Sequence, residues 1–525
     1  MRDWTRRQFL VGTASGLGVL AVPAFLVRTR LARGSPLPVP PTTVASAAAD
    51  LDATYFATEF GVDGATIGRV MRAALTSGGD FADLYFQHRL SSSLALEDGR
   101  IHRASTTVDL GVGIRVVVGE QTGYAYTEEF DETSMKRAAA TAASIARSAR
   151  SIAPESYAIA GHPQYYPIET AWTEVGVDRK IPLLETLDRD IARRDPRISK
   201  ASIFFADSTS RIMVVTSDGL AVEDDQPSGY LRATVVAEQD GRRERNGFAI
   251  SGRRDVHSFG ADTLDEIART AVERTLLLFE AVQPPAGEMP VVLGPGESGV
   301  LLHEAIGHGM EADFNRKQIS IYADMIGRPI AGEQVTIIDD GTVANARGSI
   351  NVDDEGEPGQ RTVLVENGIL RTYLHDRISA GHYRVPRTGS GRRESFRYPP
   401  LPRMRTTYMT DGPHDPEEII RSVKKGVYAA NFTNGQVQIG AGDFSFYVSS
   451  GFLIEDGRLT APVKDINMIG NGPNVLENVS MVGDDMALSR GGWNCGKGGQ
   501  SVPVSLGQPT IRVDSGVTIG GIEQG

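Results

Sequence analysis

The sequence predicts an α+β fold of two domains, in which each domain has an antiparallel sheet with packed helices. The chain has 525 residues, and a single hydrophobic core stops growing well below that length, so at least two domains are expected. Few helical segments separate the predicted strands, which argues against a doubly wound parallel sheet. Asp-Gly or Asn-Gly pairs recur between β-branched or alternating segments, which is typical of tight hairpins. These pairs are Asp98-Gly99, Asp218-Gly219, Asp240-Gly241, Asp340-Gly341, Asn367-Gly368 and Asp456-Gly457.

Residues 1–33 differ in character from the rest of the chain. Arg6-Arg7 stand before an apolar stretch, 9–27, that is broken only by Gly, Ser, Thr and Pro23. This segment resembles a twin-arginine (Tat) export signal, so we expect a periplasmic or other extracytoplasmic location. The alternative is a single transmembrane anchor, because such a stretch could just span a bilayer. An uncleaved leader would then tether the protein, and no other membrane contact is expected.

The remaining chain is divided by composition and by hydrophobic periodicity. A Pro/Ala/Ser-rich linker at 34–50 precedes an N-terminal α+β domain at 51–285, and a C-terminal domain follows at 286–525. The boundary is placed at the Pro-Pro-Ala-Gly segment before an apolar strand. Helices are expected at 67–75, 135–152 and 263–279, and the apolar strand at 291–293.

The net charge argues against a nucleic-acid-binding protein, and the cysteine content excludes a protein stabilised by an internal disulfide. The formal net charge is −12, whereas a nucleic-acid-binding surface needs a clustered excess of Lys and Arg. The single cysteine excludes an intramolecular disulfide.

The segment 291–317 contains the most informative motif. A strand and a Gly/Pro turn lead to Ser298, a candidate N-cap, and then to a helix that carries His303-Glu304 and His308. Two helical histidines usually chelate zinc at i, i+4, whereas the spacing here is i, i+5, which in a regular helix separates the side chains by about 140°. A π-bulge would restore chelation, and Gly307 would lower the cost of that distortion. On spacing alone, two histidines that merely pack or face solvent remain an equal alternative.

Cys495 shifts this balance toward a metal site. It lies in a glycine-rich segment with little core to join, and two histidines with one thiolate leave a fourth tetrahedral position for water, as a catalytic zinc site requires. The segment Gly491-x4-Gly496-Lys497 is also close to a phosphate-binding loop. However, Gly498 replaces the Ser/Thr that would hold magnesium, so nucleotide binding is rejected.

Four separated segments together resemble the TldD/PmbA family, and specifically its metal-bearing TldD branch. They are HEAIGHGMEADFNRK (303–317), TGSGRRESFRYPPLPRMRTTYM (388–409), IGNGPNVLENV (469–479) and CGKGGQSVPVSLGQPTIRV (495–513). The resemblance implies a zinc-dependent protease of the HExxxH type with two-domain subunits. It also implies dimers that enclose a cavity for peptides or unfolded polypeptides, with either a second copy or a PmbA-like paralogue as the partner.

The resemblance also assigns roles to individual residues. His303, His308 and Cys495 would be the ligands of Zn²⁺, and Glu304 would be the catalytic general base on zinc-bound water. Two alternatives remain open: a cysteine hydrolase that uses Cys495 as its nucleophile, and a non-catalytic assembly partner of a family heterodimer.

An arginine-rich loop at 384–405 gives a weaker signal. Its guanidinium groups could hold a substrate carboxylate, but internal ion pairing is the expectation for each arginine in this acidic protein. No arginine is therefore assigned to the site.

Overall fold

The computed structural model describes residues 51–148 and 152–521. The expected export signal at 1–33 and linker at 34–50 lie outside the described residues. Within these two ranges, every helix is too short or too polar to cross a membrane.

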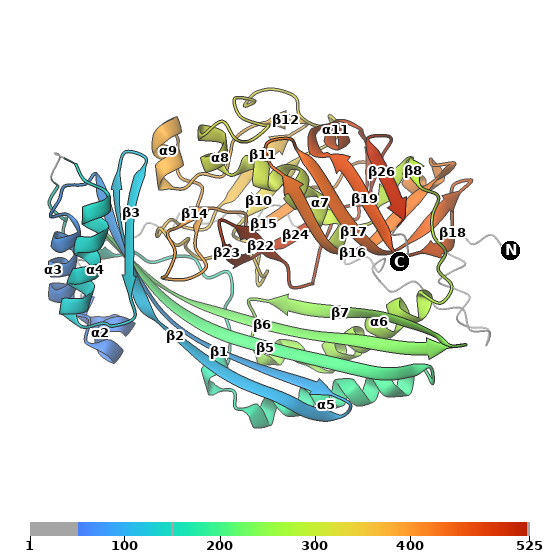
Figure 1. Cartoon of the computed structure of the whole chain (residues 1–525), viewed down its shortest axis with the longest axis horizontal. Coiled ribbons are helices and arrows are strands. Elements are labelled where there is room, and N and C mark those ends of the chain that lie inside the picture. The colour runs from blue at the N-terminus through green and yellow to red at the C-terminus, as the bar shows by residue number, and fades with distance from the viewer. Residues whose placement is uncertain (1–50, 149–151, 522–525) are drawn as a thin grey trace.

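One sheet of long strands dominates the N-terminal half of the molecule (Figure 1). The strands are ordered β3-β2-β1-β5-β6, β7 is antiparallel to β6, and short β4 pairs with β6 in parallel. Their bounds are β1 (Phe81–Glu97), β2 (Arg100–Val118), β3 (Gln121–Thr127), β4 (Ala158–Ile159), β5 (Ile198–Thr216), β6 (Leu220–Gln239) and β7 (Arg242–Gly252).

Helices cover this sheet at its two ends, so a single sheet carries two separate cores (Figure 1). At one end, α3 (Gly64–Ala74) and α4 (Glu132–Ile145) pack together on apolar residues of β1 and β2. At the other end, α5 (Val177–Arg194) and α6 (Ala261–Leu277) pack on β5 and β6. The other short helices here are α2 (Tyr55–Phe60) and the 3₁₀ turns η2 (Leu51–Ala53), η3 (Trp172–Glu174) and η4 (Val256–Phe259).

The helices predicted around residues 67–75 and 263–279 are confirmed by α3 and α6. The third prediction, 135–152, is wrong at its C-terminal end, because α4 stops at Ile145 and Ala146 is extended. The Ala142 carbonyl of α4 lies so close to Gly123 of β3 that a Cβ there would be 2.1 Å from it. Close packing of the last turn of α4 against β3 therefore accompanies the end of the helix at Ile145.

Five of the six predicted hairpin turns are confirmed, namely those at Asp98, Asp218, Asp240, Asn367 and Asp456, each of which joins two consecutive antiparallel strands.

The Asp340-Gly341 pair is the exception. The strand after it begins only at Arg361, and the Asp340 carboxylate accepts the backbone N–H of Thr342 at 2.8 Å. This aspartate therefore opens a long loop instead of a tight hairpin.

Two sheets enclose the C-terminal core, one of nine strands and one of six. The first is ordered β20-β25-β9-β16-β17-β19-β26-β8 with β18 on β17, and the second β12-β11-β10-β15-β24-β21. The first sheet comprises β8 (Gly287–Glu288), β9 (Val291–Leu293), β16 (Lys425–Gln438), β17 (Asp443–Glu455), β18 (Arg458–Val463), β19 (Ile466–Asn471), β20 (Val479–Val482), β25 (Ile511–Val513) and β26 (Val517–Gly521). The second comprises β10 (Ile337–Asp340), β11 (Arg361–Glu366), β12 (Ile369–Leu370), β15 (Thr406–Met409), β21 (Ala487–Leu488) and β24 (Ser505–Gln508).

Two small hairpins and several short helices complete this half. The hairpins are β13 (Gly391–Arg392) with β14 (Leu401–Pro402), and β22 (Asn494–Lys497) with β23 (Gln500–Pro503). The helices are η5 (Glu297–Gly299), α7 (Val300–Leu302), η6 (His303–Gly307), η7 (His308–Met310), α8 (Ala312–Arg316), α9 (Arg377–Tyr383), α10 (Pro416–Arg421) and α11 (Gly472–Glu477).

The predicted α+β class is confirmed, and most strand pairs are antiparallel. The pairs β9–β16 and β15–β24 are parallel. A small apolar cluster joins the long sheet to the C-terminal half, where Phe396 and Val352 pack against Tyr85, Ile212 and Val214. The boundary expected at residue 285 stays a prediction.

Candidate metal centre

The segment from α7 to η7 winds as a π-helix at the motif. Residues His303–Gly307 form this turn, and the backbone N–H of His308 donates to the carbonyl of His303, five residues earlier. A π turn places residue i+5 near the angular position that i+4 has in an α-helix. The two imidazole rings therefore lie on the same side, with centroids 4.9 Å apart.

Gly307 is needed in this turn for a reason other than the one expected. Its φ of −56° is available to any residue, so conformational freedom is not what the position requires. A Cβ at Gly307 would lie 2.1 Å from the sulfur of Met404. The glycine therefore allows the π turn to pack closely against Met404, which lies between β14 and β15.

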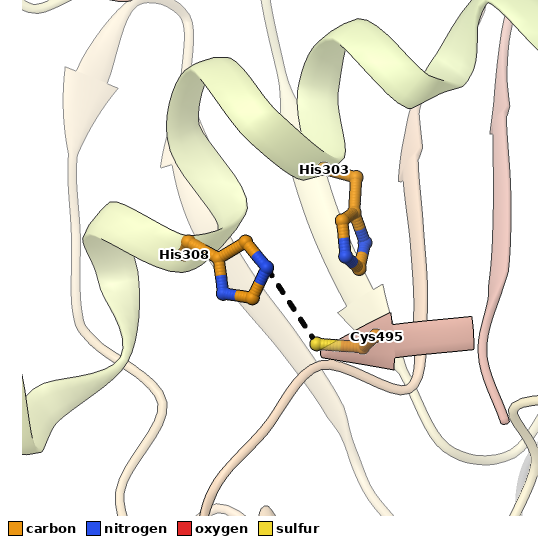
Figure 2. A group of neighbouring side chains, drawn as sticks. All are labelled: His303, His308 and Cys495. Carbon is orange, nitrogen blue, oxygen red and sulfur yellow. Dashed lines mark hydrogen bonds between the residues drawn. The ribbon is translucent and has the colours of Figure 1, made fainter. Parts of the chain in front are cut away.

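Cys495 of β22 meets the two histidines from the opposite side (Figure 2). Its Sγ lies 3.7 Å from Nε2 of His308, and one ligand atom from each of the three residues lies within 4.8 Å of the others. All three side chains are buried. The structure thus brings together the three residues that the sequence predicts as ligands.

The distances and donors are compatible with one zinc ion. In tetrahedral coordination, with Zn–N near 2.0–2.1 Å and Zn–S near 2.3 Å, a nitrogen and a sulfur ligand lie about 3.5 Å apart. The distance between Nε2 of His308 and Sγ of Cys495 is 3.7 Å, which is close to this value. Nδ1 of His303 is buried and has no hydrogen-bond partner in the described part of the chain, so this ring has a nitrogen that can accept a ligand. Two imidazoles and one thiolate form a donor set that suits zinc.

A buried carboxylate orients the His308 ring from behind. Glu311 is fully buried, and its Oε2 lies 2.9 Å from Nδ1 of His308. Lys497 and Arg403 compensate its charge, at 3.3 and 3.8 Å. Burial opposes ionisation of Glu311, but Lys497, His308 and Arg403 together lower its pKa to about 2.

These charges also act on the candidate ligands. Burial favours the neutral form of Cys495, yet the neighbouring His308 and His303 rings lower the pKa of its thiol well below the ordinary value. Burial likewise favours neutral His308, but Glu311 and Cys495 raise its pKa well above the ordinary value. The surroundings therefore favour a thiolate, which is the form that binds metals.

Glu304 follows His303 in the π turn and faces β16. It is 9% exposed, and a Cβ on Gly435 of β16 would lie 3.0 Å from its Cγ. Its carboxylate forms no hydrogen bond or ion pair with any side chain or backbone group of residues 51–148 and 152–521. This carboxylate is thus available to a ligand.

Sequence reasoning missed Glu311 and misassigned Ser298. Glu311 stands three residues after His308, a spacing that places both on neighbouring helical positions, and this is the signal that could have identified it. Ser298 is not an N-cap, because its hydroxyl donates to the carbonyl of Gly294 and accepts from Gln508. His375 is not part of the centre, because its ring packs against the rings of Tyr373 and Tyr383.

Comparison with known proteins gives consistent matches along the chain. Residues 82–146 match PmbA/TldA metallopeptidase domain 1, residues 171–279 the central domain of that family, and residues 286–521 its C-terminal domain. The "Metalloprotease TldD homolog" of Haemophilus influenzae is 41% identical over 454 residues, which cover 84% of this chain and 93% of that protein.

Two further relatives extend the comparison. The "Zinc metalloprotease TldD homolog" of Saccharolobus solfataricus is 27% identical over 85% of this chain and 98% of its own length. The crystal structure of TldE from Thermococcus kodakarensis has the same fold, with a TM-score of 0.68, 19% identity, and coverage of 87% of this chain and all of that one.

Proposed function

The chain belongs to the TldD/PmbA family of metallopeptidases. We propose that it is a zinc-dependent peptidase of the HExxxH type. The observation that carries the proposal is the convergence of His303, His308 and Cys495 on one point from segments 187 residues apart. Three protein ligands leave one coordination position for water or substrate, which distinguishes catalytic from structural zinc sites.

Each residue of the centre has a separate task in this proposal. His303, His308 and Cys495 hold the ion, which when bound supplies Lewis-acid polarisation of the scissile carbonyl and makes a water molecule more acidic. Glu304 accepts the proton of the attacking water and passes it to the leaving amine. Glu311 accepts the Nδ1 proton of His308, so that Nε2 is the ring nitrogen that faces the metal position.

The substrate, partner and location extend the proposal on the basis of family resemblance. We propose that peptides or unfolded polypeptide segments are the substrates. We propose a dimer with a second copy or with a PmbA-like paralogue, and export through the Tat route. A non-catalytic assembly role is disfavoured, because all four residues of the motif are present.

Chelation tests the proposal most directly. We expect 1,10-phenanthroline to abolish cleavage of a fluorogenic peptide, and added Zn²⁺ to restore it, because the ion is held by only three protein ligands. Zinc content is measured on the same samples. Full cleavage by a protein that contains no metal would contradict the proposal.

A cysteine hydrolase is the second candidate, because the contact between Cys495 and His308 also resembles a thiolate–imidazolium pair. Two observations disfavour it: Cys495 is fully buried, whereas reactive cysteines are partly exposed, and a second histidine faces the same sulfur. Inactivation by iodoacetamide together with resistance to chelators would support this candidate instead.

Replacing Glu311 with glutamine tests the support of the metal ligand. The amide keeps the shape but loses the charge that fixes His308, so zinc affinity is expected to fall about 10–100-fold. The measurement is competition for zinc with a chromophoric chelator. Asp339→Asn is the matched control, because Asp339 is a fully buried partner of Arg405 with no contact to the three ligands. Equal losses in both variants would indicate a general effect of removing a buried charge.

A further inference from the structure

A polar cavity of about 270 Å³ lies between the long sheet and the C-terminal half. Strands β1, β5 and β6 form one wall, with Gln87, Ser210 and Gln226 among the lining residues. The opposite wall comes from the β22–β23 hairpin and from the loops around 347–354 and 392–394. Hydroxyl, amide and guanidinium groups make up most of the lining of the cavity.

This cavity is separate from the candidate metal centre. Asn494, Ser501 and Pro503 of the hairpin line it, whereas Cys495 and its cross-strand partner Val502 are buried on the other face. Successive side chains of a strand point to opposite faces. The hairpin therefore divides the two sites, with the metal ligands on one side and the cavity on the other.

Arg253, Arg347 and Arg392 are three of the five arginines that line the cavity, and, like Arg89, they form no ion pair with a carboxylate among residues 51–148 and 152–521. The fifth, Arg393, pairs with Asp83. Arg253 donates to the carbonyls of Ser349 and Pro227 at 3.1 and 3.4 Å, and neither bond uses Nη2. Arg392 donates to the carbonyls of Met404 and Pro503 at 2.6 and 2.8 Å.

Arg347, the third arginine, donates to the Trp493 carbonyl at 3.2 Å and to the Asn494 side chain at 2.8 Å, so its Nη1 is not used. Burial lowers the pKa of Arg347 and of Arg392 to about 10. The neighbouring charges of Arg253 and Arg89 lower the pKa of Arg347 further. A bound anion would relieve the cost of burying these guanidinium groups.

The acidic residues of the cavity already have partners. Asp353 accepts backbone N–H groups of Glu355, Glu357 and Gly391 at 2.9 Å each, and burial together with the Glu355 charge raises its pKa to about 8. Asp354 accepts the backbone N–H of Arg393 at 2.7 Å.

Glu394, the third acidic residue, accepts the backbone N–H of Ser501 at 2.7 Å. The three carboxylates are thus held by backbone N–H groups, and within the described residues none of them forms an ion pair with Arg253, Arg347 or Arg392.

We propose that this cavity is a binding site for a small oxyanion, a carboxylate or a phosphate, held by Arg253, Arg347 and Arg392. Guanidinium groups bind both anions through paired N–H donors. The volume of about 270 Å³ is below the usual range for drug-sized ligands, so it suits a small molecule or the end of a peptide. The proposal does not depend on peptide cleavage.

Calorimetric titration of the purified full chain tests the site with four probes: inorganic phosphate, succinate, trialanine and trialanine amide. We expect wild-type protein to bind at least one oxyanion with a Kd of about 1 mM or lower. Binding of trialanine but not of its amide would identify a peptide carboxylate as the ligand. Binding of phosphate or succinate alone would identify a free small anion.

Arg347→Gln is expected to weaken that binding roughly 10-fold or more, because one charge-assisted donor pair is lost. Arg232→Gln is the matched control, since Arg232 is exposed on β6 outside the cavity, and it should leave the Kd unchanged. Ser501→Asp is a second variant that places a carboxylate on an exposed cavity residue, and it should also weaken binding through repulsion.

The same titration on Cys495→Ala separates this site from the metal centre. That variant should keep the wild-type anion affinity, because Cys495 lies on the other face of the hairpin. Absence of binding for all four probes, equal binding by wild type and Arg347→Gln, or loss of binding in Cys495→Ala would each overturn the proposal.

Discussion

Replacing Glu304 with glutamine is expected to lower peptide turnover by about 10²–10⁴-fold, with zinc content unchanged. The amide has nearly the same shape as the carboxylate and leaves His303, His308 and Cys495 in place. It cannot accept a proton from the attacking water near neutral pH, so the acid–base contribution is lost. Turnover is measured with a fluorogenic peptide on samples of known metal occupancy, because a partly empty site would imitate the loss of a base.

Glu477→Gln is the matched control for this experiment. Glu477 is an exposed carboxylate at the end of α11, the helix that contacts the π turn, so it reports any effect of removing a nearby charge. Its turnover should stay within about twofold of wild type, as for surface substitutions in general. Near-normal turnover in zinc-replete Glu304→Gln would refute the assigned base, and loss of zinc from that variant would make Glu304 a ligand or a structural residue.

Cys495→Ala is expected to lose most of its bound zinc and, with it, nearly all peptide cleavage. Two imidazoles alone hold the ion weakly, because one of three protein ligands and its negative charge are gone. The fold should persist, because the metal centre is built on a large core that does not depend on the ion. Zinc per chain is measured by atomic spectroscopy after dialysis, and folding by thermal unfolding.

Val502→Ala separates the thiolate from the packing of its hairpin. Val502 pairs with Cys495 across β22 and β23 and is equally buried, so its truncation also leaves a cavity while the thiolate remains. We expect normal zinc content in this control, and zinc loss in His303→Ala and His308→Ala. Stoichiometric zinc in Cys495→Ala would remove the thiolate from the coordination sphere, whereas zinc loss in Val502→Ala would assign the effect to packing.

Local sequence signals predicted those features of the fold that local energetics decide. At Asp98-Gly99, for example, the Asp-Gly pair provides both positive φ angles of a tight hairpin between two consecutive strands. The Asp340-Gly341 pair does not form a tight hairpin, because no strand follows it directly and the next strand begins only at Arg361. The end of α4 at Ile145 also depends on packing against β3, which no periodicity records.

The candidate metal centre was predictable in its members but not in its support. The i, i+5 spacing of His303 and His308 requires a π turn for chelation, and the π turn is present. No spacing rule relates Cys495 to residues so far away in the chain, so it could be connected to the two histidines only through the chemistry of the donor set and through family resemblance. Glu311 was missed because a glutamate after a helical histidine is commonplace, and its role depends on burial beside Lys497 and Arg403.

The behaviour of the arginine-rich loop could also be predicted only in part from the sequence. Internal ion pairing, the expectation for this acidic chain, is confirmed for Arg387, Arg393, Arg397, Arg403 and Arg405. Arg384 and Arg392 form no ion pair within the described residues, and the Arg392 guanidinium donates to two backbone carbonyls. Composition predicts the average behaviour of such a loop, whereas tertiary structure determines which arginines have a carboxylate partner and which line a cavity.

The wide separation of the ligands along the chain has a consequence for biosynthesis. Cys495 follows His308 by 187 residues, and ribosomes add about 5–20 residues per second. The nascent chain therefore carries both histidines for roughly 10–40 s before the thiolate emerges. If the proposed centre needs all three ligands, we expect zinc to bind only after the hairpin has been translated and folded, so that an incomplete chain on the ribosome would have no peptidase activity.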